Sequence, residues 1–141
     1  MNNFVIKPGA LNLADIYRLH SETLNISLDP DCIPAIHAST AVVDQVIADD
    51  RTVYGINTGF GLLANTRIEK DELDVLQRSI VLSHAAGIGA FMKPATVRLM
   101  MILKINSLAR GYSGIRLSVI EALITLVNKE IYPCVPSKGS V

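Results

Sequence analysis

The sequence predicts a mainly α-helical fold, with at most short strands near the N-terminus. Apolar residues recur at three- and four-residue spacing through several long segments, which is typical of helices that bury one face. Half of the 141 residues are hydrophobic and only 18% are charged. This is more apolar than a small free-standing domain needs, because a small domain has much surface to cover. We therefore expect residues 1–141 to form, without an internal domain boundary, part of a larger helical and oligomeric protein.

Composition and charge exclude several classes of protein. No uninterrupted apolar run approaches the roughly 18 to 20 residues that a membrane-spanning helix needs. The best candidate, 97–109, is interrupted by Arg98, Lys104 and Asn106. Thirteen basic and thirteen acidic residues leave no net charge, and no basic run with interleaved aromatics suggests nucleic acid as a partner. The N-terminus lacks the features of a secretory signal, so we expect a cytoplasmic protein.

The cysteines and histidines do not predict a metal site. Cys32 and Cys134 lie far apart and form no Cys-x-x-Cys pair, so neither a disulfide framework nor a zinc site is expected. We interpret both as structural, reduced thiols. His20 is expected to be solvated at a helix end. His37 has no partner at metal-ligand spacing and is expected to lie in the core or at its boundary.

Local signals predict the order of the elements. The expected elements are strands or extended segments over residues 4–6 and 26–28, and helices over about 12–20, 29–49, 69–84, 94–112 and 117–129. Asn12 is suited to cap the first helix, and Asp29 followed by Pro30 is a typical start for the second. Acidic residues near position 70 suit the positive end of the third helix dipole. The fourth helix, opened by Pro94, is apolar nearly all round, which is typical of a central helix.

The end of the third helix carries a histidine on its apolar side. Leu76, Ile80 and His84 are spaced four residues apart, so His84 shares a face with the apolar stripe. A buried imidazole without a hydrogen-bond partner would cost about 1–3 kcal/mol, so a partner is expected. Gly87 and Gly89 are expected to break the helix and leave room for a small molecule or a close backbone.

The segment from Val53 to Gly61, Val-Tyr-Gly-Ile-Asn-Thr-Gly-Phe-Gly, is the only place where glycine, polar and aromatic residues crowd together between helical segments. Its glycines permit positive φ and close approach, and loops of this kind often carry binding or catalytic groups. The glycine spacing matches neither a dinucleotide fingerprint nor a phosphate-binding P-loop. By composition alone, a plain connection is the favoured interpretation of this segment.

Three separated segments resemble, in the right order, motifs of the aromatic amino acid ammonia-lyases. They are Tyr-Gly-Ile-Asn-Thr-Gly-Phe-Gly at 54–61, Leu-Ser-His-Ala-Ala-Gly at 82–87 and Pro-Cys-Val-Pro-Ser-Lys-Gly-Ser-Val at 133–141. The resemblance covers essentially the whole chain and places it in the N-terminal part of such an enzyme. In the family the third segment continues through one more glycine into Ala-Ser-Gly, which cyclises into a methylidene-imidazolone prosthetic group. The resemblance thus implies an electrophile formed beyond Val141, with no dissociable cofactor and no metal.

The resemblance also implies a reaction. Members of the family eliminate ammonia from an L-amino acid and leave an α,β-unsaturated acid. Tyr54 matches the loop tyrosine to which the acid/base role is assigned. Ser83 and His84 occupy the pair of positions that distinguishes substrate side chains, and Ser-His there implies L-histidine as substrate and urocanate as product.

The remaining site residues follow from the same resemblance. Gly61 is expected to line the substrate through its backbone, and the loop is expected to be shaped by Asn57, Thr58, Gly59 and Phe60. The family forms homotetramers with shared active sites. Because the prosthetic-group tripeptide and the downstream substrate-binding residues of the family are not among the 141 residues, these residues alone are expected to be inactive.

Other functions remain open at this point. A tyrosine or phenylalanine ammonia-lyase, or an aminomutase of the same family, shares the loop and the electrophile. In a different class, a non-catalytic helical scaffold or interaction module would leave Tyr54 and His84 with structural roles only.

Overall fold

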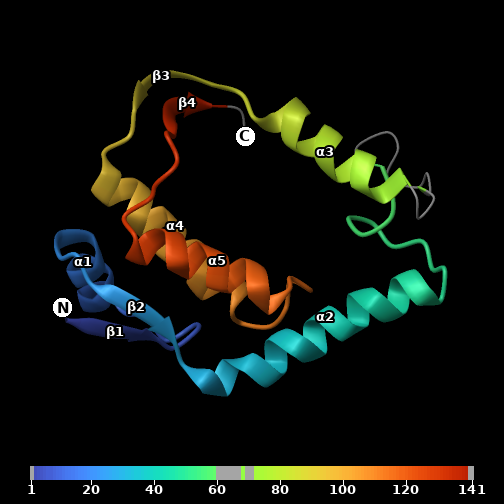
Figure 1. Ribbon diagram of the computed structural model, residues 1–141, viewed down its shortest axis with the longest axis horizontal. Helices are drawn as coiled ribbons and strands as arrows, with labels where there is room; N and C mark the ends of the chain where they lie inside the picture. Colours follow the sequence, from blue (N-terminus) through green and yellow to red (C-terminus); the bar gives the residue numbers. More distant parts are fainter. Residues whose placement is uncertain (1, 60–67, 69–71, 140–141) are drawn as a thin grey trace.

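The computed structural model describes residues 2–59, 68 and 72–139 (Figure 1). The elements are β1 (Asn3–Ile6), α1 (Leu13–Ser21), β2 (Asn25–Leu28), a 3₁₀ turn η1 (Pro30–Cys32), α2 (Ile33–Ala48), α3 (Leu73–His84), β3 (Gly87–Phe91), α4 (Pro94–Leu108), α5 (Leu117–Asn128) and β4 (Pro136–Gly139). The predicted helical fold is confirmed, and every predicted helix is present.

The N-terminal elements form as their local signals predict. β1 and β2 pair in parallel, with Phe4 opposite Ile26, and α1 connects them. Asn12 caps α1 in a reciprocal arrangement. Its side chain accepts a hydrogen bond from the Asp15 backbone N–H, and its own N–H donates to the Asp15 carboxylate, both at 3.0 Å. Such a capping box satisfies two backbone donors that the helix itself leaves unpaired.

The start of the second helix differs in detail from the prediction. Asp29 caps the 3₁₀ turn η1, accepting a hydrogen bond from the Asp31 backbone N–H at 3.1 Å, and the α-helix begins only at Ile33. His20 is exposed at the end of α1, as predicted. His37 is exposed on α2, so the expectation of a core or boundary position is wrong for this chain. Periodicity alone placed it next to the apolar stripe, but α2 buries only Ile36 and Val46.

The main core lies where α4 and α5 pack against each other, with α1, β1 and β2 beside them (Figure 1). Its fully buried side chains include Ile6, Ile26, Ile102, Ile105 and Ile120. α4 is central on one side only, because Met100 and Leu103 on its other side are exposed. We call residues 2–48 and 92–135 the body of the molecule.

Arg98, which interrupts the apolar run of α4, is buried and has a structural role. Its guanidinium donates hydrogen bonds to the backbone carbonyls of Leu19 and His20 at 3.0 and 2.9 Å, and to the Thr23 hydroxyl at 2.9 Å. These carbonyls lie at the C-terminal end of α1, where the helix leaves acceptors unpaired and the dipole favours a positive charge. The Arg98 guanidinium therefore links α4 to the end of α1 through hydrogen bonds.

α4 ends at Leu108, about one turn before the predicted end. The chain then lies against α2 through glycines: a Cβ on Gly111 would stand 2.7 Å from the Ala35 Cβ. Gly111 also has a φ of +77°, which favours glycine. The Gly114 N–H donates to the Ser39 hydroxyl at 2.7 Å. Close approach to α2, rather than a loss of helix propensity, therefore ends α4.

A second pair of strands was not predicted. β3 and β4 pair antiparallel, with Gly87 opposite Gly139 and Ile88 opposite Lys138. The expectation of strands only near the N-terminus is therefore incomplete. The pairing joins segments far apart in the sequence, and neither segment has the alternating pattern that predicts a strand alone.

α3 lies apart from the core. None of its residues is buried, and His84, which was expected to be buried, is exposed. Figure 1 shows α3 leading from the 49–72 region toward β3 and β4, away from the α4–α5 pair. Leu76, Ile80 and His84 share a face of α3, and none of the described elements buries it. We call residues 49–91, as far as the structure describes them, the arm.

None of the described helices is long and apolar enough to cross a membrane. Cys32 and Cys134 are free thiols. Cys32 packs against the core, in agreement with a structural role, whereas Cys134 is exposed and contributes nothing to packing within this chain.

Candidate active site

Tyr54 lies in a tight turn immediately after α2. Its side chain is 62% exposed, and Gly55 beside it has a φ of +81°, in the left-handed region. The turn is closed by hydrogen bonds from the N–H groups of Ile56 and Asn57 to the Val53 carbonyl, at 3.1 and 3.3 Å. The turn thus carries a tyrosine whose side chain is largely exposed to solvent.

The residues after the turn are buried although they are polar. Asn57 is 5% exposed and Thr58 1% exposed, and Gly59 is buried as well. The Thr58 hydroxyl donates to the Gly59 carbonyl at 2.9 Å. Phe60 and Gly61, the other predicted loop and substrate-lining residues, lie outside the described residues.

Asn57 accounts for the shape of the loop. Its side-chain amide donates to the Arg51 carbonyl at 2.8 Å and accepts from the Val53 N–H at 2.9 Å. Its own carbonyl accepts from the Ile68 N–H at 2.9 Å. A side chain that reaches both sides of the turn agrees with the predicted loop-shaping role, which stays a prediction for the enzyme.

Ser83 and His84 close α3. The Ser83 hydroxyl contacts the carbonyls of Ser79 and Ile80 at 2.7 and 3.1 Å, so it points back along its own helix. His84 Nδ1 lies 2.9 Å from the Ile80 carbonyl and 3.0 Å from Ser83 Oγ. A carbonyl oxygen only accepts hydrogen bonds, so this contact requires Nδ1 to carry the hydrogen. In the neutral imidazole Nε2 is then an acceptor.

Directly after His84, the strand pair β3–β4 brings in the segment around Gly139. A Cβ on Gly87 would stand 2.8 Å from Pro136 Cγ, and one on Gly139 would stand 3.4 Å from the Ala86 carbonyl oxygen. A side chain at Gly87 would clash with the Pro136 ring, whereas one at Gly139 would only reach ordinary van der Waals contact. A shallow pocket of about 300 Å³ lies here, lined by Ala86, Gly87, Ile88, Lys138 and Gly139. The sequence analysis did not predict that the segments around Gly87 and Gly139 lie side by side. The glycines in both segments were the only indication of such a close approach.

The structure does not bring Tyr54 and His84 together within one chain. The turn that carries Tyr54 precedes α3, and His84 is the last residue of that helix. Twelve helical residues span about 18 Å. Figure 1 shows the C-terminal end of α3 beside β3 and β4, and the 49–59 segment toward its other end. The 49–59 segment and His84 thus lie toward opposite ends of α3.

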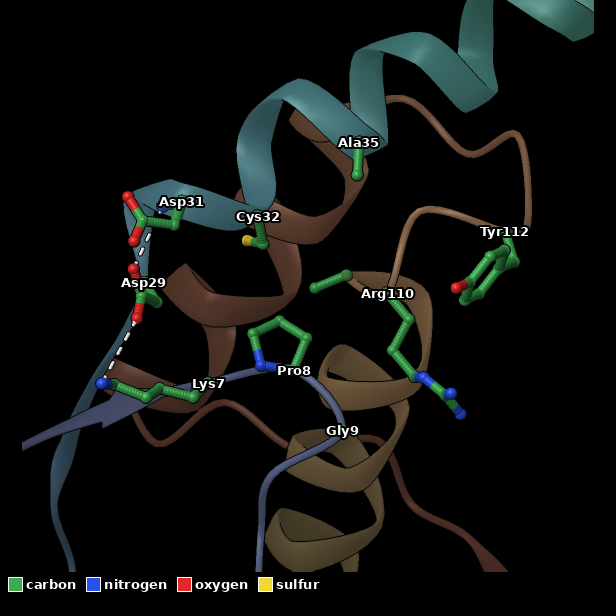
Figure 2. Close-up of a pocket in the computed structure, with 10 residues that line it drawn as sticks. Lys7, Pro8, Gly9, Asp29, Asp31, Cys32, Ala35, Arg110 and Tyr112 are labelled. Atoms are coloured by element: carbon green, nitrogen blue, oxygen red, sulfur yellow. Dashed lines mark hydrogen bonds and ion pairs between the residues drawn. The ribbon is translucent and has the colours of Figure 1, made fainter.

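A different pocket, of about 450 Å³, lies between β1, η1 and the end of α4 (Figure 2). Three of its charged groups have partners within the chain: Lys7 Nζ lies 3.9 Å from the Asp29 carboxylate, and the Arg110 guanidinium lies 5.6 Å from the Tyr112 ring centre. Burial raises the pKa of the Cys32 thiol here, which keeps the thiol protonated and unreactive. None of the predicted site residues lines this pocket.

Among the described residues, no three His, Cys, Asp or Glu side chains lie close enough together to hold a metal ion.

The comparisons define the class of protein. Residues 11–141 match the family described as aromatic amino acid lyase, and the chain belongs to this family. Histidine ammonia-lyase from Psychromonas ingrahamii is 69% identical over 96% of this chain, which corresponds to 27% of that protein. The chain thus spans little more than a quarter of the length of this curated relative.

Solved structures agree with this assignment. The crystal structure of histidine ammonia-lyase from Trypanosoma cruzi superposes with a TM-score of 0.88 at 33% identity, over 99% of this chain and 27% of that chain. A phenylalanine aminomutase from Pantoea agglomerans superposes with a TM-score of 0.89 at 27% identity, over 100% of this chain and 27% of that chain. The fold, including the separate α3 and the β3–β4 pair, is therefore that of the ammonia-lyases and aminomutases.

Proposed function

We propose that the chain is part of a histidine ammonia-lyase, which eliminates ammonia from L-histidine to give urocanate in histidine degradation. The observation that carries this proposal is the 69% identity with histidine ammonia-lyase over nearly the whole chain. The Ser83–His84 pair supports the choice of substrate within the family.

Two obstacles make this elimination slow in water: the β-proton is barely acidic and the amine is a poor leaving group. A methylidene-imidazolone, formed from Ala-Ser-Gly beyond Val141, would supply the electrophile when present. The close approach of Gly139 to Ala86 suits such a group, since it leads the chain past the end of α3 without intervening side chains. Ser83 and His84 would then lie next to the reacting centre.

Tyr54 is proposed as the acid/base group of the reaction. Its phenol is exposed on a turn whose backbone hydrogen bonds define its position. In its deprotonated phenolate form, the Tyr54 oxygen would accept the β-proton, while the C–H electron pair forms the carbon–carbon double bond and the C–N electron pair leaves with the amine. A positioned base typically contributes about 10²- to 10⁴-fold in rate.

His84 is proposed to select the substrate. With its Nδ1–H donated to the Ile80 carbonyl, the neutral ring offers the Nε2 lone pair to a ligand. An imidazole N–H of L-histidine would donate to it, whereas a phenyl ring has no donor. A phenyl analogue would leave Nε2 of His84 without a hydrogen-bond partner in a closed site, and this cost disfavours the analogue more strongly than the loss of apolar contact does.

The site is proposed to be completed by other subunits of a homotetramer. The separation of Tyr54 from His84 along α3 supports this, as does the exposed apolar surface of the arm, for example Val81 at 64% and Leu82 at 69% exposure. The isolated 141 residues would then have no activity. Light scattering of the complete enzyme would give the mass of the assembly.

The decisive experiment compares kcat/KM of the complete enzyme for L-histidine, L-tyrosine and L-phenylalanine, following the ultraviolet absorbance of the conjugated product. A preference for L-histidine, lost on His84→Phe, is the expected result. A preference for L-phenylalanine would refute the assignment of His84.

An aminomutase is the second candidate within this family, because one solved neighbour is a phenylalanine aminomutase. Accumulation of a β-amino acid instead of the unsaturated acid would favour it. A protein that turns over none of the three amino acids would support the non-catalytic scaffold.

A further inference from the structure

The side chain of Asn57 forms a clasp around the Tyr54 turn. Its Nδ2 donates to the Arg51 carbonyl at 2.8 Å, on the α2 side of the turn, and its Oδ1 accepts from the Val53 N–H at 2.9 Å. Tyr54 lies in the sequence between Val53 and Asn57. The two hydrogen bonds therefore close residues 51–57 into a ring that includes Tyr54, whose side chain is exposed.

The clasp is attached to the end of α2. The Arg51 N–H donates to the Val46 carbonyl at 3.1 Å, and the Asp50 N–H donates to the Ile47 carbonyl at 3.3 Å. These two bonds, with Asp50 at a φ of +58°, form a Schellman motif that ends the helix. Val46 is buried. A continuous set of hydrogen bonds thus leads from a buried residue of α2 to the Tyr54 turn.

The described contacts of the turn are mainly polar. Neither Tyr54 nor Gly55 is buried, and the buried residues of the arm are Asn57, Thr58 and Gly59, as far as the arm is described. Gly55 makes the turn costly to order, because glycine loses more conformational freedom than other residues. Hydrogen bonds to a buried side chain, and not apolar packing, supply the order.

We propose that Asn57 is the positioning residue for Tyr54, holding the phenol at the distance and angle that proton transfer requires. This inference rests on the proposed acid/base role of Tyr54. Asparagine suits the position because one short side chain supplies both a donor and an acceptor. Aspartate has the same size but no donor, and its charge would face the Arg51 carbonyl.

The chain offers a matched control. Asn128, in the last turn of α5, forms the same kind of paired contact with one backbone residue: its Oδ1 accepts from the Ile26 N–H at 2.8 Å and its Nδ2 donates to the Ile26 carbonyl at 2.9 Å. It joins α5 to β2 within the body, far along the chain from Tyr54. Asn128→Asp therefore removes an equivalent donor without touching the turn.

The test is a double-mutant cycle in the complete enzyme, measuring kcat of wild type, Asn57→Asp, Tyr54→Phe and the double variant. Asn57→Asp is expected to lower kcat by about ten- to a hundredfold, the range for a misplaced catalytic group. In the Tyr54→Phe background it should change kcat by less than about twofold, because a residue that acts only through the phenol has nothing left to position. Asn128→Asp should lower kcat by the same small factor in both backgrounds.

The outcomes separate this inference from the proposed function. A fully active Tyr54→Phe enzyme would remove Tyr54 from the reaction and the inference with it. An impaired Tyr54→Phe enzyme in which Asn57→Asp gives the same fold-loss in both backgrounds would overturn the inference alone. An Asn57→Asp enzyme with normal kcat would do the same.

Hydrogen exchange in the wild-type enzyme tests the clasp without any substitution. The Val53 and Asn57 amides are expected to exchange at least about tenfold more slowly than those of an unstructured peptide. Exchange at the unstructured rate at Val53 would contradict the clasp even if the variants fail to fold.

Discussion

The body and the arm of this chain are held together by different interactions. All the buried apolar side chains of the described residues lie in the body, on β1, α1, β2, α2, α4 and α5 and next to these elements. In the described part of the arm, the buried residues are Asn57, Thr58 and Gly59. The body therefore gains its stability from apolar burial within the chain, and the arm is ordered by hydrogen bonds near α2 and by strand pairing with β4.

This difference separates the residues that fold the chain from those proposed to act on a substrate. The arm carries Tyr54, Ser83 and His84, and it also exposes large apolar side chains such as Ile88 and Phe91, at 74% and 67%. Exposed apolar surface of this kind is typical of regions that contact another protein or a ligand. The site that we propose there would be shared between chains, with the body as its support.

The largest effect on stability is expected for a truncation in the body. Ile105→Ala removes a fully buried side chain at the centre of α4 and should lower the free energy of unfolding by about 2–5 kcal/mol. Val81→Ala, on exposed α3, should change it by less than about 0.5 kcal/mol in the 141-residue chain. Urea denaturation of the two variants measures both values, and equal losses would contradict the division into body and arm.

The next largest effect is expected on activity alone. Tyr54→Phe should lower kcat of the complete enzyme at least about a hundredfold, or roughly 2.7 kcal/mol in the activation barrier. Because the phenol is exposed in the chain, the melting temperature should change little. Steady-state kinetics and thermal denaturation of the same preparation measure both, with Ile105→Val as a control that lowers stability and leaves kcat unchanged.

Arg98→Met tests the one buried charged group of the described residues. The variant keeps most of the apolar stem but leaves the carbonyls of Leu19 and His20 without their donor. We expect a loss of about 1–3 kcal/mol in the free energy of unfolding. Arg98→Lys should recover only part of it, since an ammonium group lacks the planar fork of donors. If Arg98→Met left the free energy of unfolding unchanged, apolar burial alone would hold α1 against α4.

The smallest effect is a stabilisation at the end of α5. Glu130 has a φ of +56°, and the Ile131 N–H donates to the Leu126 carbonyl at 2.9 Å, so the helix ends in a Schellman motif with a non-glycine residue in the left-handed position. Glu130→Gly should raise the free energy of unfolding by about 0.5–1 kcal/mol. Glu130→Ala, which keeps the Cβ, should give no comparable gain in the same urea titration.

Much of the fold could be predicted from short-range patterns. The capping box at Asn12, the prolines that open η1 and α4, and the stripe of α5 depend on neighbours within a few residues. The family resemblance likewise rested on contiguous motifs, and the comparisons confirm it. The errors fall where a residue's surroundings depend on distant segments: His37 and His84 lie next to apolar residues on their helices, yet both are exposed in the described part of the chain.

The sequence by itself therefore determined which segments are helical, the capping of α1 and the family, because hydrogen bonds within helices and caps link residues close along the chain. The tertiary structure decided the β3–β4 pairing, the early end of α4 against α2 and the exposure of His84. Each of these depends on which distant segments meet, and periodicity shows only that a helix has an apolar side, without showing what covers it.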